Sequence, residues 1–99
     1  MKAILIPVEG KAEIIEIDNE LKPFQEAVGG YIETLTIASD CCLICDEEGR
    51  LKGKPLNVRA SQLGTLIVGD VLIVGVDEDE FTDVPEAAIK LFKERWPIL

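Results

Sequence analysis

Residues 2–30, KAILIPVEGKAEIIEIDNELKPFQEAVGG, form the stretch from which the fold is best inferred. They begin with two β-like runs rich in isoleucine, Lys2 to Val8 and Ala12 to Asp18. The connection Glu9-Gly10-Lys11 has three residues and contains glycine, as hairpin loops commonly do. The sequence therefore predicts that the chain opens with an antiparallel pair of strands.

A short helix is predicted to follow this hairpin. Leu21, Phe24 and Val28 recur at the spacing of one helical face. Gly29-Gly30 would end the helix, because glycine readily adopts the left-handed conformation that terminates helices. Two strands followed by a helix also resemble the opening of β-grasp domains.

The middle of the chain contains further β-like runs. Tyr31 to Ala38 is dense in β-branched residues, and Cys41 to Cys45 is a second apolar run that ends at an acidic turn. We expect another hairpin with a weak second arm here. Pro55 to Gln62 shows no clear period and suits either a loop or a helical turn.

Two more apolar runs, Thr65 to Val68 and Val71 to Val76, flank Gly69-Asp70. A Gly-Asp pair between such runs is typical of a tight hairpin turn, and it also suits a bulge in one bent strand. The acidic segment that follows, Asp77 to Asp83, is expected to be a turn.

A C-terminal helix is predicted from its start signal and its apolar stripe. Asp83 and Glu86 have the spacing of a capping box, in which the Asp83 carboxylate accepts the Glu86 N–H. The stripe consists of Val84, Ala88, Leu91, Phe92 and Trp96.

Strands with few interleaved helices favour an α+β domain with a mostly antiparallel sheet and helices covering one face. Residues 1–99 contain no linker or low-complexity segment, so we assign them to a single domain. Neither Tyr31 to Ala38 nor the first strand carries the Lys and Pro residues that usually protect a sheet edge, apart from Lys2 at the start of the first strand and Pro7. Either strand could therefore pair with a second copy in a homo-oligomer.

The charge balance and residue types exclude several functions. The chain has 19 acidic and 10 basic residues and no histidine. Without histidine, Ser-His and Cys-His catalysis are excluded, and no nucleophile motif is present, so we expect neither catalytic residues nor an enzyme. The net charge of −9 disfavours nucleic-acid binding, because affinity for phosphates comes from clustered Lys and Arg. No cofactor or metal site is predicted.

The distribution of apolar residues indicates a folded, cytoplasmic protein. With 47% apolar residues, the chain can bury enough surface to fold. The apolar run after Met1-Lys2 is too short for a signal peptide, and no stretch approaches the roughly 20 apolar residues of a membrane helix.

Cys41, Cys42 and Cys45 fall within five residues, and reduced thiols fit them better than a secreted disulfide framework. Cys42 and Cys45 formally make a C-x-x-C motif, which suggests a redox dithiol or half of a zinc site. The alternative is that all three are small apolar strand residues. In a strand, Cys41 and Cys45 would share one face and Cys42 the other.

Lys52, Lys54 and Arg59 form the one local basic cluster. They suit an anion site with Asn57 as a further hydrogen-bond partner, or charges that only keep a loop soluble.

Two stretches carry a family resemblance, Gly29 to Glu33 (GGYIE) and Glu47 to Asn57 (EEGRLKGKPLN). Together with the opening residues and Ile67 to Gly75, they resemble the small bacterial and phage family called the domain of unknown function 3846. The resemblance implies a short, standalone cytoplasmic protein, often carried by phages, plasmids and Gram-positive genomes, with no established activity. The positions that it marks for an interaction surface are Gly29, Gly30, Tyr31, Glu33, Gly53, Pro55 and Asn57, to which we add the nearby Arg59.

The leading hypothesis is a non-enzymatic accessory factor of a mobile element. It would bind a host or phage protein through the face formed by Gly29 to Glu33 and Pro55 to Arg59. A second hypothesis is a binder of a small, nucleotide-like ligand at an oligomer interface, through Lys52, Lys54 and Arg59. A third is a DNA mimic, which requires the carboxylates to form one continuous surface stripe.

Overall fold

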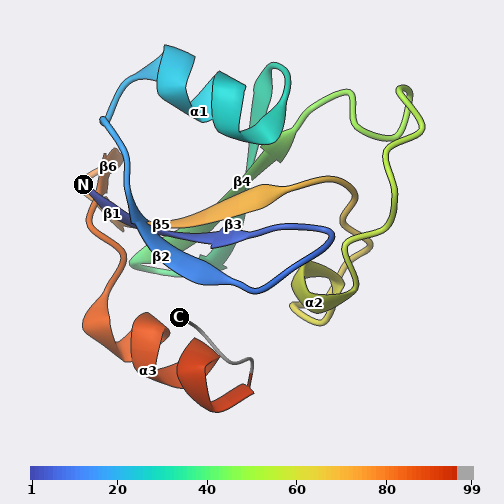
Figure 1. Cartoon of the computed structure of the whole chain (residues 1–99). Helices are drawn as coiled ribbons and strands as arrows, with labels where there is room; N and C mark the ends of the chain where they lie inside the picture. Colours follow the sequence, from blue (N-terminus) through green and yellow to red (C-terminus); the bar gives the residue numbers. More distant parts are fainter. Residues whose placement is uncertain (96–99) are drawn as a thin grey trace.

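The computed structural model describes residues 1–95, which form an antiparallel sheet with helices on both faces (Figure 1). The strands are β1 (Lys2–Ile6), β2 (Glu13–Glu16), β3 (Ile32–Ala38), β4 (Cys41–Asp46), β5 (Val71–Asp77) and β6 (Glu80–Thr82). The helices are α1 (Leu21–Val28), α2 (Val58–Ser61) and α3 (Glu86–Arg95). The strand order is β2-β1-β5-β4-β3, with β6 paired to β5. The predicted α+β class with a mostly antiparallel sheet is confirmed.

The opening of two strands and a helix agrees with the prediction. β1 and β2 pair antiparallel, with Ala3 opposite Ile15. α1 ends at Val28, and Gly29 follows in the left-handed conformation with a φ of 82°. The hairpin loop and the glycine stop therefore act as their sequence signals indicate.

β5 is the central strand of the sheet. It pairs with β4 on one side, and with β1 and β6 on the other. Residues Val71 to Val74 are completely buried. Both predictions for the Gly69-Asp70 region were wrong, because β5 is the one strand of this region and no turn or bulge joins it to a partner strand there.

The preceding apolar run is held by the Ser61 side chain and by a short backbone bridge to residues 55–57, and it does not pair with a strand of the sheet. The Ile67 N–H donates to Ser61 Oγ, and its carbonyl accepts the Asn57 N–H. Val68 makes an isolated bridge to Leu56. The run therefore packs beside α2 rather than joining the sheet as a strand.

Helices cover both faces of the sheet, so the expectation that they would cover one face was wrong. α1 packs Phe24 and Val28 onto one face, where Ile44 and Leu72 are buried. The opposite face, below the sheet in Figure 1, is covered by α2 and α3. The physical reason is that β4 and β5 are apolar at consecutive positions, and consecutive strand residues point to opposite faces.

The C-terminal helix forms, but its start and its buried face differ from the prediction. The Asp83 carboxylate accepts the Lys2 N–H over 2.7 Å, and α3 begins at Glu86. Ile89 and Phe92 are buried, whereas Leu91 is 49% exposed. Trp96, assigned to the stripe, lies outside the described residues. The acidic segment expected to be a turn also contains strand β6.

Within residues 1–95, the ends of the main strand order are β2 and β3. β3 is therefore an edge, as expected. The first strand lies between β2 and β5, so the expectation that it could pair with another copy was wrong. None of the helices in the described part of the chain combines the length and apolar character that a bilayer crossing requires.

Candidate functional site

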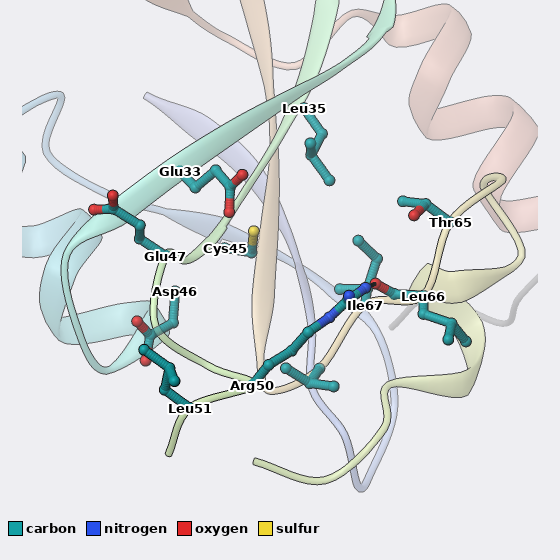
Figure 2. Close-up of a pocket in the computed structure, with 11 residues that line it drawn as sticks. Glu33, Leu35, Cys45, Asp46, Glu47, Arg50, Leu51, Thr65, Leu66 and Ile67 are labelled. Carbon is teal, nitrogen blue, oxygen red and sulfur yellow. Dashed lines mark hydrogen bonds between the residues drawn. The ribbon is translucent and has the colours of Figure 1, made fainter. Parts of the chain in front are cut away.

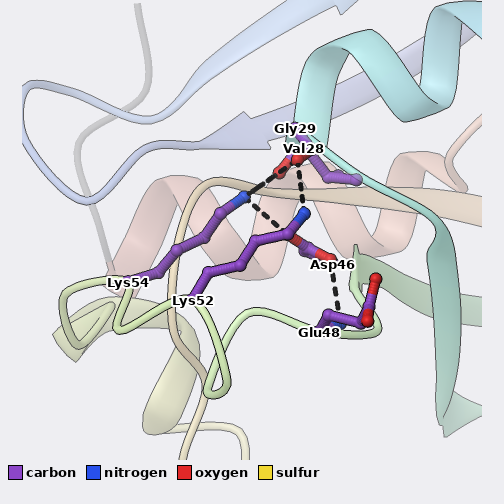
Figure 3. A network of polar contacts seen from close by, with 6 residues as sticks. All are labelled: Val28, Gly29, Asp46, Glu48, Lys52 and Lys54. Carbon is purple, nitrogen blue, oxygen red and sulfur yellow. Dashed lines mark hydrogen bonds and ion pairs between the residues drawn. The ribbon is translucent and has the colours of Figure 1, made fainter.

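The most developed polar feature is a buried carboxylate held by two lysines (Figure 3). Asp46 is the last residue of β4, and its side chain is 1% exposed. Its Oδ2 lies 2.8 Å from Lys54 Nζ and 2.9 Å from Lys52 Nζ. Its Oδ1 accepts the Glu48 N–H over 2.9 Å. The charge of Asp46 is thus fully compensated within the fold.

These contacts set the ionisation of Asp46. Burial raises the pKa of its carboxyl, because a charge is less well solvated there. Hydrogen bonds from Lys54, Lys52 and the Glu48 N–H, together with the charge of Lys54, outweigh burial and lower this pKa from 3.8 to about 2. Asp46 is therefore ionised at neutral pH and is no candidate for a general acid.

The same two ammonium groups cap helix α1. Lys54 Nζ lies 2.6 Å from the Val28 carbonyl oxygen, and Lys52 Nζ lies 3.0 Å from that of Gly29. The last carbonyl groups of a helix lack partners within the helix and carry partial negative charge, so cations stabilise them. The network therefore fastens α1 to the turn after β4.

A cavity of about 300 Å³ lies beside strand β3, and we call it the edge cavity (Figure 2). Its apolar lining includes Leu35 of β3, Cys45 of β4 and Ile67. Leu51 and Leu66 also line it, and they are 86% and 63% exposed. Arg50 extends towards Leu66 and donates to its carbonyl oxygen over 2.8 Å.

A wider concavity of about 550 Å³ lies at the end of α1, and we call it the α1 groove. Its apolar lining comes from Pro7, Val8, Ala27, Val28 and Pro55. Three carboxylate residues also line it, Glu9, Glu26 and Asp70, and the single cation among the lining residues is Lys54. Because Lys54 is already paired with Asp46, the groove presents mainly negative charge.

The family model of a domain of unknown function, DUF3846, matches residues 1–97 of the 99-residue chain. The chain belongs to the DUF3846 family. No curated protein and no solved structure matches it.

The glycine pair of the DUF3846 chain has a structural explanation at this network. A Cβ on Gly30 would lie 2.5 Å from both Asp46 Oδ1 and Lys52 Nζ. A Cβ on Gly29 would lie 2.8 Å from Lys54 Nζ, and Gly29 has a positive φ. The positive φ therefore favours glycine at position 29, and the short, buried Asp46 side chain leaves no room for a Cβ at position 30, whereas the lysine ends could shift.

The residues predicted for the interaction surface do not share one concavity. Gly29 and Pro55 line the α1 groove, and Glu33 lines the edge cavity. Gly30, Tyr31, Gly53, Asn57 and Arg59 line neither of them. Tyr31 is 66% exposed.

Asn57 cannot serve as a surface residue, because it is completely buried. Its Nδ2 donates to the carbonyl oxygens of Ile6, at 2.8 Å, and Gly69, at 2.9 Å. Its Oδ1 accepts the Ala60 N–H and caps helix α2. Its polar atoms are thus satisfied within the protein, and its role is structural.

The basic cluster is not an open anion site. Lys52 and Lys54 neutralise Asp46, while Arg59 Nη2 donates to the carbonyl oxygens of Pro7 and Gly10. The three side chains therefore do not converge on one point, as the nucleotide-like ligand hypothesis requires.

Two groups of carboxylates lie at opposite ends of the sheet. One group surrounds the start of β1 and the β5–β6 turn; we call this the acidic end, and its members are Glu16, Asp18, Asp40, Asp77, Glu78, Asp79, Glu80 and Asp83. Another group, Glu9, Glu26 and Asp70, surrounds the α1 groove. This separation offers no support for DNA mimicry.

The cysteines lie as strand alternation predicts. Cys41 and Cys45 belong to the cluster beneath α3, and Cys42 belongs to the cluster beneath α1. Cys42 and Cys45 therefore point to opposite faces and cannot bind one metal ion or form a disulfide. Burial raises the pKa of Cys41 and of Cys45 to about 11, with smaller contributions from neighbouring acidic residues, so neither is a reactive thiolate.

Sequence reasoning missed Asp46 and the acidic rim of the α1 groove. The signal available for Asp46 was its place at the end of a fully apolar run, where an aspartate is expected to need a partner. The rim joins three separate segments, and no local pattern connects them.

Proposed function

We propose that this chain is a non-enzymatic binding protein whose α1 groove docks a basic, partly apolar segment of another protein. The observation that carries this proposal is the composition of the groove lining, which combines five apolar residues with three carboxylate residues, Glu9, Glu26 and Asp70. Such a surface suits a peptide that presents a large apolar side chain next to Lys or Arg.

The charges of the groove favour a cationic occupant. Lys54 is 22% exposed and makes close contacts with Asp46 and the Val28 carbonyl oxygen, so it does not cancel the rim carboxylates. Glu9 and Glu26 are exposed, and the net charge of the whole chain is −9. A basic partner would be drawn to this surface, and added salt would weaken its binding.

The bacterial or mobile-element origin that the resemblance implies would make the partner a host or phage protein. Three buried, unpaired cysteines are in keeping with a reducing cytoplasm.

The experiment is a selection of random linear peptides displayed on phage, followed by calorimetry with synthetic copies of the selected peptides. We expect the selected peptides to share a large apolar residue beside Lys or Arg. Reversing two rim charges with Glu9→Lys and Glu26→Lys should weaken their binding at least about tenfold.

The matched control is Glu80→Lys, which reverses an exposed carboxylate at the acidic end. It should leave peptide affinity within about twofold of the unsubstituted chain. Selected peptides without basic residues, or affinity that Glu9→Lys and Glu26→Lys leave unchanged, would overturn the proposal.

A further inference from the structure

Strand β3 is an edge strand whose only irregularity is a register shift against β4 between Thr36 and Ala38, near its end. It has seven residues, Ile32–Ala38, and pairs on one side with β4. Its sequence, IETLTIA, contains neither Lys nor Pro, and its one charged residue is Glu33. The other end of the main strand order, β2, has four residues and carries glutamate at both ends. Unprotected edges of this length are templates for pairing with another strand.

The face of β3 towards α3 is also incompletely covered. Leu35 and Ile37 pack against the core but are only partly buried. The edge cavity opens beside them, and Glu33 and Leu35 belong to its lining. The outer backbone edge of β3 and its partly buried apolar side chains could therefore both contact another strand.

We propose that β3 pairs antiparallel with β3 of a second copy of this chain, with Leu35 on the two-fold axis. In this register, Leu35 lies opposite Leu35 of the second copy, and Thr34 lies opposite Thr36. Glu33 lies opposite Ile37, so no like charges meet, whereas a register centred on Glu33 would place two carboxylates opposite each other. The strand is thus self-complementary in this arrangement.

The same register brings an apolar side chain of the second copy to the edge cavity. Residues directly opposite each other in an antiparallel pair have Cβ atoms about 5 Å apart. Ile37 of the second copy would therefore lie beside Glu33, a lining residue of the edge cavity.

The antiparallel orientation also keeps the two acidic ends apart. The acidic end includes Asp40 and the β5–β6 turn, and it lies where β3 finishes. Antiparallel pairing places the two acidic ends at opposite ends of the joined sheet.

The test introduces opposite charges at Leu35 in two separate variants. Sedimentation velocity then measures dimerisation from micromolar to millimolar concentration. The unsubstituted chain should dimerise within this range. Leu35→Lys and Leu35→Glu should each raise the dimer dissociation constant at least about tenfold, because like charges then meet on the axis. An equimolar mixture of the two variants should recover a heterodimer.

Ile14→Lys is the matched control, since it places lysine at a partly buried isoleucine of the other edge, β2. It should leave the dimer intact. Hydrogen exchange of the unsubstituted chain gives a readout without substitution: amides of β3 should become more protected as concentration rises, and those of β2 should not. A monomer at all concentrations, a dimer insensitive to Leu35→Lys, or a dimer lost in Ile14→Lys would overturn the proposal.

Discussion

The Nζ atom of Lys54 lies 2.6 Å from the carbonyl oxygen of Val28, a residue 26 positions earlier in the chain. The same ammonium group lies 2.8 Å from the buried carboxylate of Asp46. One side chain therefore links the end of α1, the end of β4 and the wall of the α1 groove. The negative charge that stabilises the two lysines in this region is the Asp46 carboxylate of the chain itself.

Asp46→Asn should destabilise the protein by about 2 kcal/mol, because two partly buried ammonium groups then lose their counter-charge. Chemical denaturation with urea measures this loss. Glu47→Gln, at an exposed neighbour, should change the unfolding free energy by less than about 0.5 kcal/mol. Equal losses in the two variants would contradict the role assigned to Asp46.

Stability should fall on acidification in a way that depends on Asp46. Its pKa is about 2 in the folded chain and 3.8 ordinarily, so the unfolded chain takes up the proton more readily. The contribution of Asp46 is therefore complete above pH 4 and is lost as the pH falls towards 2. The difference in unfolding free energy between the unsubstituted chain and Asp46→Asn should shrink over this interval. A difference that stays constant with pH would show that its carboxylate is not the titrating group.

Gly30→Ala should destabilise the protein by about 2 kcal/mol or more, because the new methyl group would displace Asp46 or Lys52. Gly53→Ala is a useful comparison. Gly53 has a φ of 70° but no neighbouring atom within 4 Å of a new Cβ. That substitution should cost about 1 kcal/mol from backbone strain alone. Thermal unfolding followed by circular dichroism would rank the two, and the reverse order would argue against steric exclusion at Gly30.

Asn57→Ala should destabilise the protein by about 3 kcal/mol, since the carbonyl groups of Ile6 and Gly69 and the N–H of Ala60 would lose their partner. Val58→Ala, at the adjacent exposed position, should have an effect below about 1 kcal/mol. Urea denaturation distinguishes them. If Asn57→Ala unfolded no more readily than Val58→Ala, the buried amide would not organise this loop.

The three cysteines should react slowly with a thiol reagent in the folded chain. They are buried, and burial raises the pKa of each thiol. Reaction should therefore follow transient opening of the sheet and become fast in urea. Absorbance after addition of an aromatic disulfide reagent gives the rate. Rapid labelling of any one cysteine without denaturant would contradict its placement in the core.

Local sequence patterns predicted the structure correctly where the conformation depends on neighbouring residues. The Gly29 stop of α1 and the alternation of Cys41, Cys42 and Cys45 depend on residues close in sequence, and both were predicted. Local patterns failed where a group outside the apolar run decides its backbone partners. Ile67 has the composition of a strand residue, but its N–H and carbonyl groups are taken by Ser61 and Asn57.

Local sequence patterns were also insufficient to predict the candidate site. Gly29 and Pro55 do line one groove, as the leading hypothesis required, but Asn57 faces the core. Lys52 and Lys54 were recognised only as members of a basic cluster with Arg59, and the buried carboxylate that binds the two lysines could not be inferred from an acidic turn. Whether a polar residue faces solvent or core depends on packing between segments, which no short stretch of sequence encodes.

The central place of β5 also sets the order in which the protein can be built. β1 and β4 are separated in the sheet by β5, which is made from Val71–Asp77. The β1–β2 and β3–β4 hairpins precede β5 along the chain. They cannot join into one sheet until β5 pairs between them. Ribosomal synthesis must therefore pass residue 77 before a core can close, and pairing over such long sequence separations makes folding slow compared with that of a helical bundle of equal length. A nascent chain stopped at residue 70 would expose both apolar faces of its hairpins and would depend on chaperones until released.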